Sequence, residues 1–194
     1  MHLTLMISIK VGNRQVPQLG QGTWNMGDSA SKRAAEIAAL RRGVELGLQV
    51  IDTAEMYGDG RSETLVGEAV RGMREQVYLV SKVLPSHASA EGTVKACEAS
   101  LKRLGVEALD LYLLHWRGRF ALAETVEGFE RLQRGGKIKA WGVILFMRKA
   151  HSWYLLFTLR RMMQPELLNA MRKRSCVCCR SCSPWMALQS RRPS

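Results

Sequence analysis

The chain has 194 residues, of which 46% are hydrophobic and 24% charged, and this composition excludes a collagen-like chain or one that is disordered throughout. Its formal net charge is +12. Residues 1–143 contain 19 Lys and Arg against 16 Asp and Glu, whereas residues 144–194 contain 10 against one, no Gly and four of the five Cys. The basic balance therefore belongs mostly to the end of the chain, and it indicates no nucleic-acid partner for the rest.

No stretch of the sequence has the pattern of a secretory signal or of a membrane span. Residues 1–20 lack a charged start followed by an apolar core. The apolar stretch 143–159 is interrupted by Arg148, Lys149 and His151. One cysteine before residue 144, Cys97, is typical of a reducing compartment. We therefore expect a cytoplasmic protein with no membrane partner.

Short apolar runs of β type recur at intervals of about 30 residues, which is the size of a βαβ unit. Their centres are Gly20, Val50, Leu79, Tyr112 and Trp141. Apolar residues at helical spacing lie between them, over residues 34–44, 62–73, 94–104 and 122–134. Ser62 is expected to cap the second of these helices, and Gly105 to end the third. The pattern predicts alternating strands and helices.

Strands that alternate with helices are expected to be parallel and buried, as in a doubly wound sheet or a (βα)8 barrel. A small hairpin is predicted ahead of them, from residues 6–10 and 15–16. A complete barrel needs about 250 residues, whereas this sequence shows four strand–helix units and a fifth strand. We therefore expect an α/β fold with only the N-terminal half of a (βα)8 TIM barrel.

Polar residues that close these apolar runs are the first candidates for chemistry, because functional groups of parallel α/β folds gather at the carboxyl ends of the strands. The candidates are Asp52, Tyr57, Lys82 and His115. A Lys82 ammonium held by Asp52 would stabilise the phenolate that forms when neutral Tyr57 donates its proton. Taken singly, each residue is more often a turn, packing or solvated residue. Their combination at three successive strands favours a catalytic site.

Four segments carry a resemblance to a known family: residues 20–24 (GQGTW), 51–58 (IDTAEMYG), 80–82 (VSK) and 110–116 (DLYLLHW). They resemble the aldo-keto reductases, in particular bacterial members of the methylglyoxal-reductase type. The resemblance implies a (βα)8 barrel that binds NADPH without a Rossmann fold. It also implies the reduction of aldehydes and ketones to alcohols, with small carbonyls such as methylglyoxal as expected substrates.

The resemblance also assigns roles to residues. It makes Tyr57 the general acid, supported by Asp52 and Lys82, and gives His115 the task of orienting the carbonyl or assisting proton transfer. Cofactor-binding positions are matched by Gly22, Thr23 and Asp52. Substrate-binding positions are matched by Trp24 and Trp116, for which aromatic core packing is the alternative.

The match to the family ends after Val143. The family continues with Ser-Asn-Phe, whose first two side chains hold the nicotinamide carboxamide, whereas this chain has Ile144, Leu145 and Phe146, of which none can replace those hydrogen bonds. We therefore expect residues 1–143 to form a partial barrel domain, and residues 144–194 to be a basic, Cys-rich tail foreign to the family and poorly packed. Local helix is predicted within residues 154–174. A shift of the coding frame near Val143 is our hypothesis for the change.

The tail suggests two other functions, a metal site and an electrostatic nucleic-acid site. Its basic runs at residues 172–174 and 191–192 could bind nucleic acid, but no recognised binding module accompanies them, and a solvated charge run is the alternative. Its four cysteines could be a thiolate metal site, but they are too closely spaced for the usual zinc geometry, so no metal is expected; they are Cys176, Cys178, Cys179 and Cys182. The truncated barrel is expected to be an impaired reductase. The alternative is a non-catalytic half-barrel that self-associates or pairs with another barrel.

Overall fold

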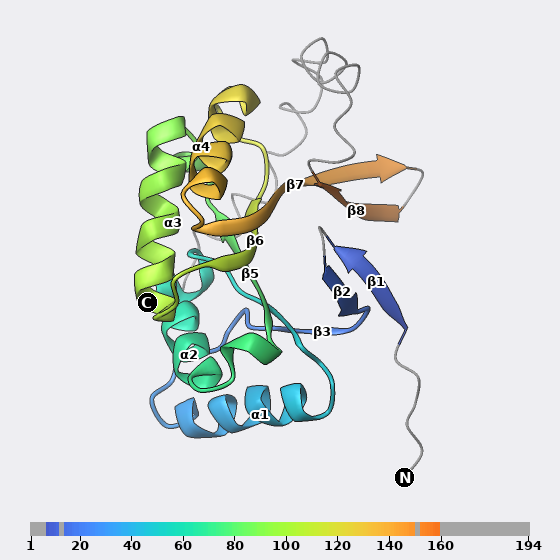
Figure 1. Cartoon of the computed structure of the whole chain (residues 1–194), viewed down its shortest axis with the longest axis vertical. Coiled ribbons are helices and arrows are strands. Elements are labelled where there is room, and N and C mark those ends of the chain that lie inside the picture. The colour runs from blue at the N-terminus through green and yellow to red at the C-terminus, as the bar shows by residue number, and fades with distance from the viewer. Residues whose placement is uncertain (1–6, 12–13, 150–151, 160–194) are drawn as a thin grey trace, which may run out of the picture. The chain divides into compact units, whose positions relative to one another are not determined.

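The computed structural model describes residues 7–11, 14–149 and 152–159. Its main sheet has six strands whose order in space is their order in the chain (Figure 1). They are β3 (Gly20–Gly22), β4 (Val50–Asp52), β5 (Tyr78–Val83), β6 (Leu109–Leu114), β7 (Ile138–Lys149) and β8 (Ser152–Leu159). The first five are parallel, and β8 pairs antiparallel with β7. The five predicted strand centres are therefore confirmed.

Four helices follow the first four strands of this sheet, and all lie on the same side of it (Figure 1). They are α1 (Arg33–Glu45), α2 (Arg61–Val70), α3 (Ala90–Leu104) and α4 (Leu122–Arg134). Three short 3₁₀ turns accompany them: η1 (Tyr57–Gly60), η2 (Arg74–Gln76) and η3 (Pro85–His87). Helices on one side of a parallel sheet belong to a (βα)8 barrel rather than to a doubly wound sheet. Strands β3 to β7 and the four helices form the first half of such a barrel.

The two sides of the sheet bury different side chains, because successive residues of a strand point in opposite directions. On the helix side, Tyr112 meets Phe129 edge to face at 5.7 Å between ring centroids, and Phe129 stacks on Trp141 at 5.5 Å. On the other side lies a cluster of Tyr78, Val80, Leu111, Leu113, Ile144 and Val16. The central strands β5 and β6 are therefore buried on both sides.

Val16 comes from the predicted hairpin, which is confirmed as β1 (Ser8–Val11) and β2 (Arg14–Pro17). Arg14 of this hairpin donates hydrogen bonds to the backbone carbonyls of Glu75 at 3.1 Å and Val77 at 3.4 Å. The hairpin is thus fixed near the amino ends of the strands, at the end of the sheet opposite to the predicted site.

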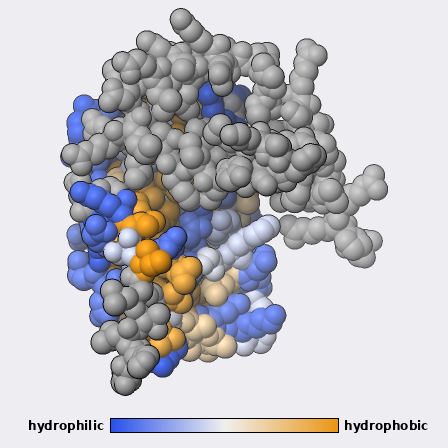
Figure 2. Space-filling model, turned by 90° about the vertical axis from the view of Figure 1, so that its right-hand side faces the viewer, coloured by the Kyte–Doolittle hydropathy of each residue, from blue (hydrophilic) through white to orange (hydrophobic). Residues whose placement is uncertain are grey.

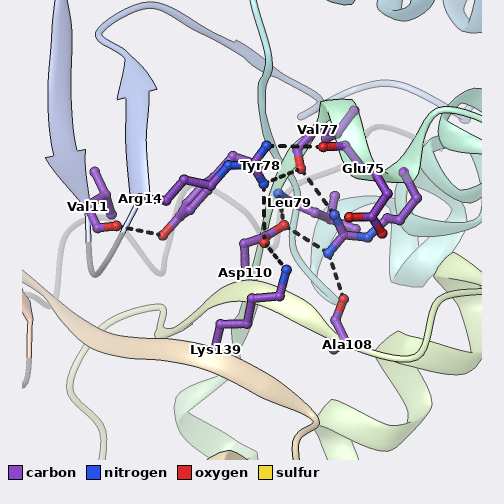
Figure 3. A network of polar contacts seen from close by, with 10 residues as sticks. Val11, Arg14, Glu75, Val77, Tyr78, Leu79, Ala108, Asp110 and Lys139 are labelled. Atoms are coloured by element: carbon purple, nitrogen blue, oxygen red, sulfur yellow. Dashed lines mark hydrogen bonds and ion pairs between the residues drawn. The ribbon is translucent and has the colours of Figure 1, made fainter.

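A buried carboxylate, Asp110, organises that amino end (Figure 3). It accepts the Leu79 amide at 2.9 Å. Arg74 lies 2.8 Å and Lys139 2.9 Å from its oxygens, and Arg14 lies 3.7 Å away. Burial raises the pKa of Asp110, but the Leu79 amide and the surrounding cations outweigh it, so that the pKa lies below its ordinary value. The network ties the hairpin to β5, β6 and β7.

The described part of the tail differs from expectation. β7 runs through Val143 without a break to Lys149, and residues 152–159 form a strand rather than the start of a helix. The helix predicted within residues 154–174 is therefore wrong for residues 154–159, because pairing along β7 outweighs local helix propensity there. Residues 160–174 lie outside the described residues, and the domain boundary after residue 143 stays a prediction.

Candidate active site

The four predicted catalytic residues converge at the carboxyl ends of β4, β5 and β6. Asp52 is the last residue of β4, Lys82 the fifth of the six residues of β5, and His115 follows β6 directly. Tyr57 begins η1, in the loop that follows β4. Parallel pairing brings these strand ends to one edge of the sheet. The convergence expected from the sequence is therefore confirmed by the geometry.

Lys82 is the centre of the site. Its ammonium donates to Asp52 Oδ2 at 2.7 Å, to the Thr53 carbonyl at 2.9 Å and to Tyr57 Oη at 3.0 Å. An ammonium has three N–H donors, so all of them are used. The Lys82 side chain is only 5% exposed, and that of Asp52 is 39% exposed. Lys82 is thus held in one position by one carboxylate and two neutral hydrogen-bond acceptors.

Tyr57 reaches Lys82 because the chain reverses sharply behind it. Gly58, Asp59 and Gly60 have φ values of 58°, 52° and 86°, a left-handed run that favours glycine. The reversal places the Tyr57 ring over Lys82, with Nζ 4.6 Å from the ring centroid. Among the described residues, Tyr57 Oη has no hydrogen-bond partner other than Lys82. The oxygen accepts from Lys82, so the phenolic proton is free for another acceptor.

His115 faces Tyr57 across the site. The two rings meet edge to face at 5.8 Å, and the imidazole forms no hydrogen bond with any side chain or backbone group of the described residues. Burial, followed by the Lys82 charge, lowers the pKa of His115 to about 4. The imidazole is therefore neutral near pH 7, with one ring N–H available as a donor.

Because the pKa of His115 is low in the fold, we expect the free energy of unfolding to depend on pH. In the unfolded chain His115 binds a proton below its ordinary pKa of 6.5, whereas in the fold it does so only below about 4. Stability is therefore full above pH 6.5 and is lost as the pH falls towards 4. We expect this group to lower the free energy of unfolding by about 2 kcal/mol between about pH 7.5 and about pH 5.

Urea unfolding at the two pH values measures the effect, and His115→Asn, which cannot titrate, is the control. The variant should show a smaller loss of stability on acidification than the unmodified chain. An identical loss in both would contradict the assignment of a low pKa to His115.

The predicted cofactor-binding residues lie beside Asp52, at the end of β3. Gly22 is exposed, and a Cβ atom placed on it would meet nothing within 4 Å, which leaves room beside Asp52. Thr23 is buried, and its hydroxyl donates to the Asp52 carbonyl at 3.1 Å. The structure therefore gives the Thr23 side chain a bond that joins β3 to β4. Its contact with a cofactor stays a prediction.

Sequence reasoning missed the part that Ser62 plays in this junction. Ser62 was expected to cap α2, but Gly60 is the N-cap residue, with φ of 86°. Ser62 is buried, and its hydroxyl lies 2.8 Å from Thr23 Oγ1 and 3.2 Å from Thr53 Oγ1. A serine at the start of a helix is a capping signal, and only the fold shows that this one turns inward.

The two predicted substrate-binding tryptophans border the site. Trp24 stacks with Tyr57 at 6.5 Å between ring centroids and is 61% exposed. Trp116 lies 4.6 Å from the His115 ring and is 36% exposed. Their exposure excludes core packing as the explanation of either ring. Both are placed to contact a molecule that approaches Tyr57 and His115 from solvent.

Metal and membrane patterns are absent from the described residues. Within residues 7–11, 14–149 and 152–159, no three His, Cys, Asp or Glu side chains form a group that could hold a metal ion. The four clustered cysteines of the tail lie outside these residues. None of the described helices is long and apolar enough to cross a bilayer.

Comparison with known proteins decides the family. The sequence pattern of the aldo/keto reductase family matches residues 18–149, which include the whole site. The chain belongs to the aldo-keto reductase family. It is 58% identical, over 132 residues, to methylglyoxal reductase YeaE of Escherichia coli (strain K12), and this match covers 68% of the chain and 46% of the relative.

Solved structures agree with this assignment. A crystal structure of an aldo-keto reductase from Klebsiella pneumoniae in complex with NADPH has a TM-score of 0.70 and 52% identity, and covers 72% of this chain and 50% of that one. A second structure from Klebsiella pneumoniae, with NADP and acetate, has a TM-score of 0.69 and 54% identity, over 70% of this chain and 48% of that one. This aldo-keto reductase chain thus spans about half the length of the relatives it matches.

Proposed function

We propose that this chain carries the proton-donating half of an NADPH-dependent reductase of small aldehydes and ketones, with methylglyoxal as a representative substrate. One observation supports the proposal above the others: Lys82 holds Tyr57 by its oxygen at 3.0 Å and leaves the phenolic proton free. The similarity to a methylglyoxal reductase and to NADPH-bound structures supports the choice of substrate and cofactor.

The residues have separate tasks in this reaction. Tyr57 donates its proton to the carbonyl oxygen as the carbonyl carbon is reduced. The Lys82 ammonium, 3.0 Å away, stabilises the negative charge left on the Tyr57 oxygen, and Asp52 keeps Lys82 in place. Neutral His115 orients the carbonyl by donating its ring N–H. Trp24 and Trp116 form the walls of the substrate pocket.

NADPH, when bound, supplies the hydride. The room beside Gly22 and the half-exposed Asp52 carboxylate fit the approach of a flat ring to this edge of the sheet, and we assign Gly22, Thr23 and Asp52 to the cofactor site. Ile144 and Leu145 do not fit the part of that site where the family has Ser and Asn, since apolar side chains cannot hold a carboxamide. We therefore propose that reduction by this chain is impaired.

The test compares two proteins in a steady-state assay of NADPH oxidation with methylglyoxal. The first is this chain, and the second continues after Val143 with the Ser-Asn-Phe segment and the remaining strands of a family barrel. We expect turnover of the chain to be at least about a hundredfold lower, because misplacing the donor by about 1 Å is enough for such a loss. Turnover of the two within about tenfold would contradict the proposed impairment.

A second candidate is a non-catalytic half-barrel that associates with another copy. Apolar surface is visible on the side that carries β1 and β2 (Figure 2), and the exposed side chains include Ile7, Ile9 and Leu19. Exposed apolar surface that gathers into a patch is typical of association sites. Size-exclusion chromatography with NADPH fluorescence titration separates the candidates: an associated species that binds no NADPH favours the second.

For the compartment, we propose the cytoplasm, where the buried thiol of Cys97 would stay free.

A further inference from the structure

Two glutamates that flank Tyr57 in the sequence each bind a residue that flanks Lys82. Glu63 follows the turn that carries Tyr57, and it accepts a hydrogen bond from Ser81. Glu55 precedes Tyr57 by two residues, and it accepts one from the backbone amide of Leu84. The segment that contains Tyr57 is thus bonded at two points, to β5 just before Lys82 and to the residue that follows β5.

The Glu63 contact is entirely buried. Its side chain is 0% exposed, and Oε1 lies 2.6 Å from the Ser81 hydroxyl. Its other oxygen, Oε2, accepts from Arg103 Nε at 2.6 Å. Arg103 also packs on the end of the Tyr57 turn, since a Cβ atom on Gly60 would lie 2.5 Å from Arg103 Cδ. α3 therefore supports the turn and the carboxylate together.

The Glu55 contact closes the other side. Its side chain is 9% exposed, and Oε1 lies 2.6 Å from the Leu84 amide and 3.1 Å from His87 Nδ1. One carboxylate oxygen therefore fixes both the first residue after β5 and the η3 turn that follows. Charge-assisted hydrogen bonds of this length are strong and directional, and they become more so away from water.

We propose that Glu55 and Glu63 are a pair of positioning residues that set the distance between Tyr57 Oη and Lys82 Nζ. Among the described residues, Lys82 forms the only hydrogen bond that reaches the Tyr57 side chain. The left-handed turn that follows is held by a side-chain hydrogen bond only at its end, where the Thr64 hydroxyl donates to the Gly60 carbonyl at 3.1 Å. The two carboxylates supply that restraint from the loop before Tyr57 and the helix after it. This inference rests on the proposed function, because the distance matters for catalysis only if Tyr57 is the proton donor.

The test reads the Tyr57 ring directly and needs neither cofactor nor substrate. The full chain is prepared with ¹³C in its four tyrosine rings, and the Tyr57 signal is assigned by its absence in Tyr57→Phe. We expect Glu55→Gln and Glu63→Gln each to shift the Tyr57 signal, and the double variant to shift it further. The signal of Tyr78, at the amino end of β5, should stay in place, which a general loosening of the fold would not allow.

Glu68→Gln is the matched control, because Glu68 lies on the same helix as Glu63 but forms an exposed ion pair with Arg33. It should leave the Tyr57 signal unmoved. Should Glu63→Gln fail to fold, Ser81→Ala removes the contact with β5 and keeps the ion pair with Arg103; it too should shift the Tyr57 signal. An unmoved Tyr57 signal in the folded double variant or in Ser81→Ala would overturn the proposal. A shifted Tyr57 signal with unchanged turnover of methylglyoxal would count against the proposed function and not against this pair.

Discussion

Tyr57→Phe is expected to lower NADPH-dependent reduction of methylglyoxal by at least about a hundredfold. Phenylalanine keeps the ring contacts with Trp24 and His115, but it removes both the proton and the oxygen that Lys82 holds. The loss should appear in kcat rather than in KM, because the proton transfer contributes to the transition state alone. Steady-state turnover of the version that continues as a full barrel measures it with the larger signal.

Tyr78→Phe is the matched control for this prediction. Tyr78 lies at the amino end of β5, where its hydroxyl is 3.5 Å from the Val11 carbonyl, and burial raises its pKa to about 12. The same chemical change there should leave turnover within about twofold. Full activity of Tyr57→Phe would show that Tyr57 is not the acid.

Asp110→Asn is expected to lower the free energy of unfolding by about 3 to 5 kcal/mol. The carboxylate is 1% exposed, with Arg74 and Lys139 within 3 Å of its oxygens. An amide keeps the size of the side chain but leaves these cations without their counter-charge. Urea unfolding measures the change. Asp28→Asn, which breaks the exposed ion pair with Arg61, should cost less than about 1 kcal/mol.

The pH dependence of unfolding provides a second test of the role of Asp110. Because the pKa of Asp110 in the fold lies below its ordinary value of 3.8, its stabilisation is present above that value and is lost as the pH falls through the folded pKa. The unmodified chain should therefore lose part of its advantage over Asp110→Asn below about pH 4. A difference between the two that is constant down to about pH 2 would show that the carboxylate charge is not responsible.

Most of the sheet and the four proposed catalytic residues were predictable because local rules decide them. Strand spacing, helical periodicity and Gly105, which ends α3 with φ of 64°, are features of short segments. The position of Asp52, Lys82 and His115 at one edge follows from the parallel order of the strands alone. Predicting the site required only the rule that functional groups of parallel α/β folds lie at the carboxyl ends of the strands.

The remainder depends on partners that are distant in the sequence. Ser62 turns inward because the Thr23 hydroxyl and carbonyl, 39 residues away, are within its reach. Glu55 and Glu63 bind Leu84 and Ser81, which are 29 and 18 residues away. No periodicity or motif of the helix or the loop indicates these pairings, so the buried carboxylates could not be distinguished from exposed ones by sequence.

The antiparallel strand β8 affects how this chain could be completed by a second fragment. It covers the outer edge of β7 from Gly142, opposite Leu159, to Lys149, opposite Ser152. In a (βα)8 barrel that edge receives a parallel strand. A complementing half-barrel supplied in trans must therefore first displace β8, and split-enzyme reassembly should be favoured by a chain that stops at residue 149.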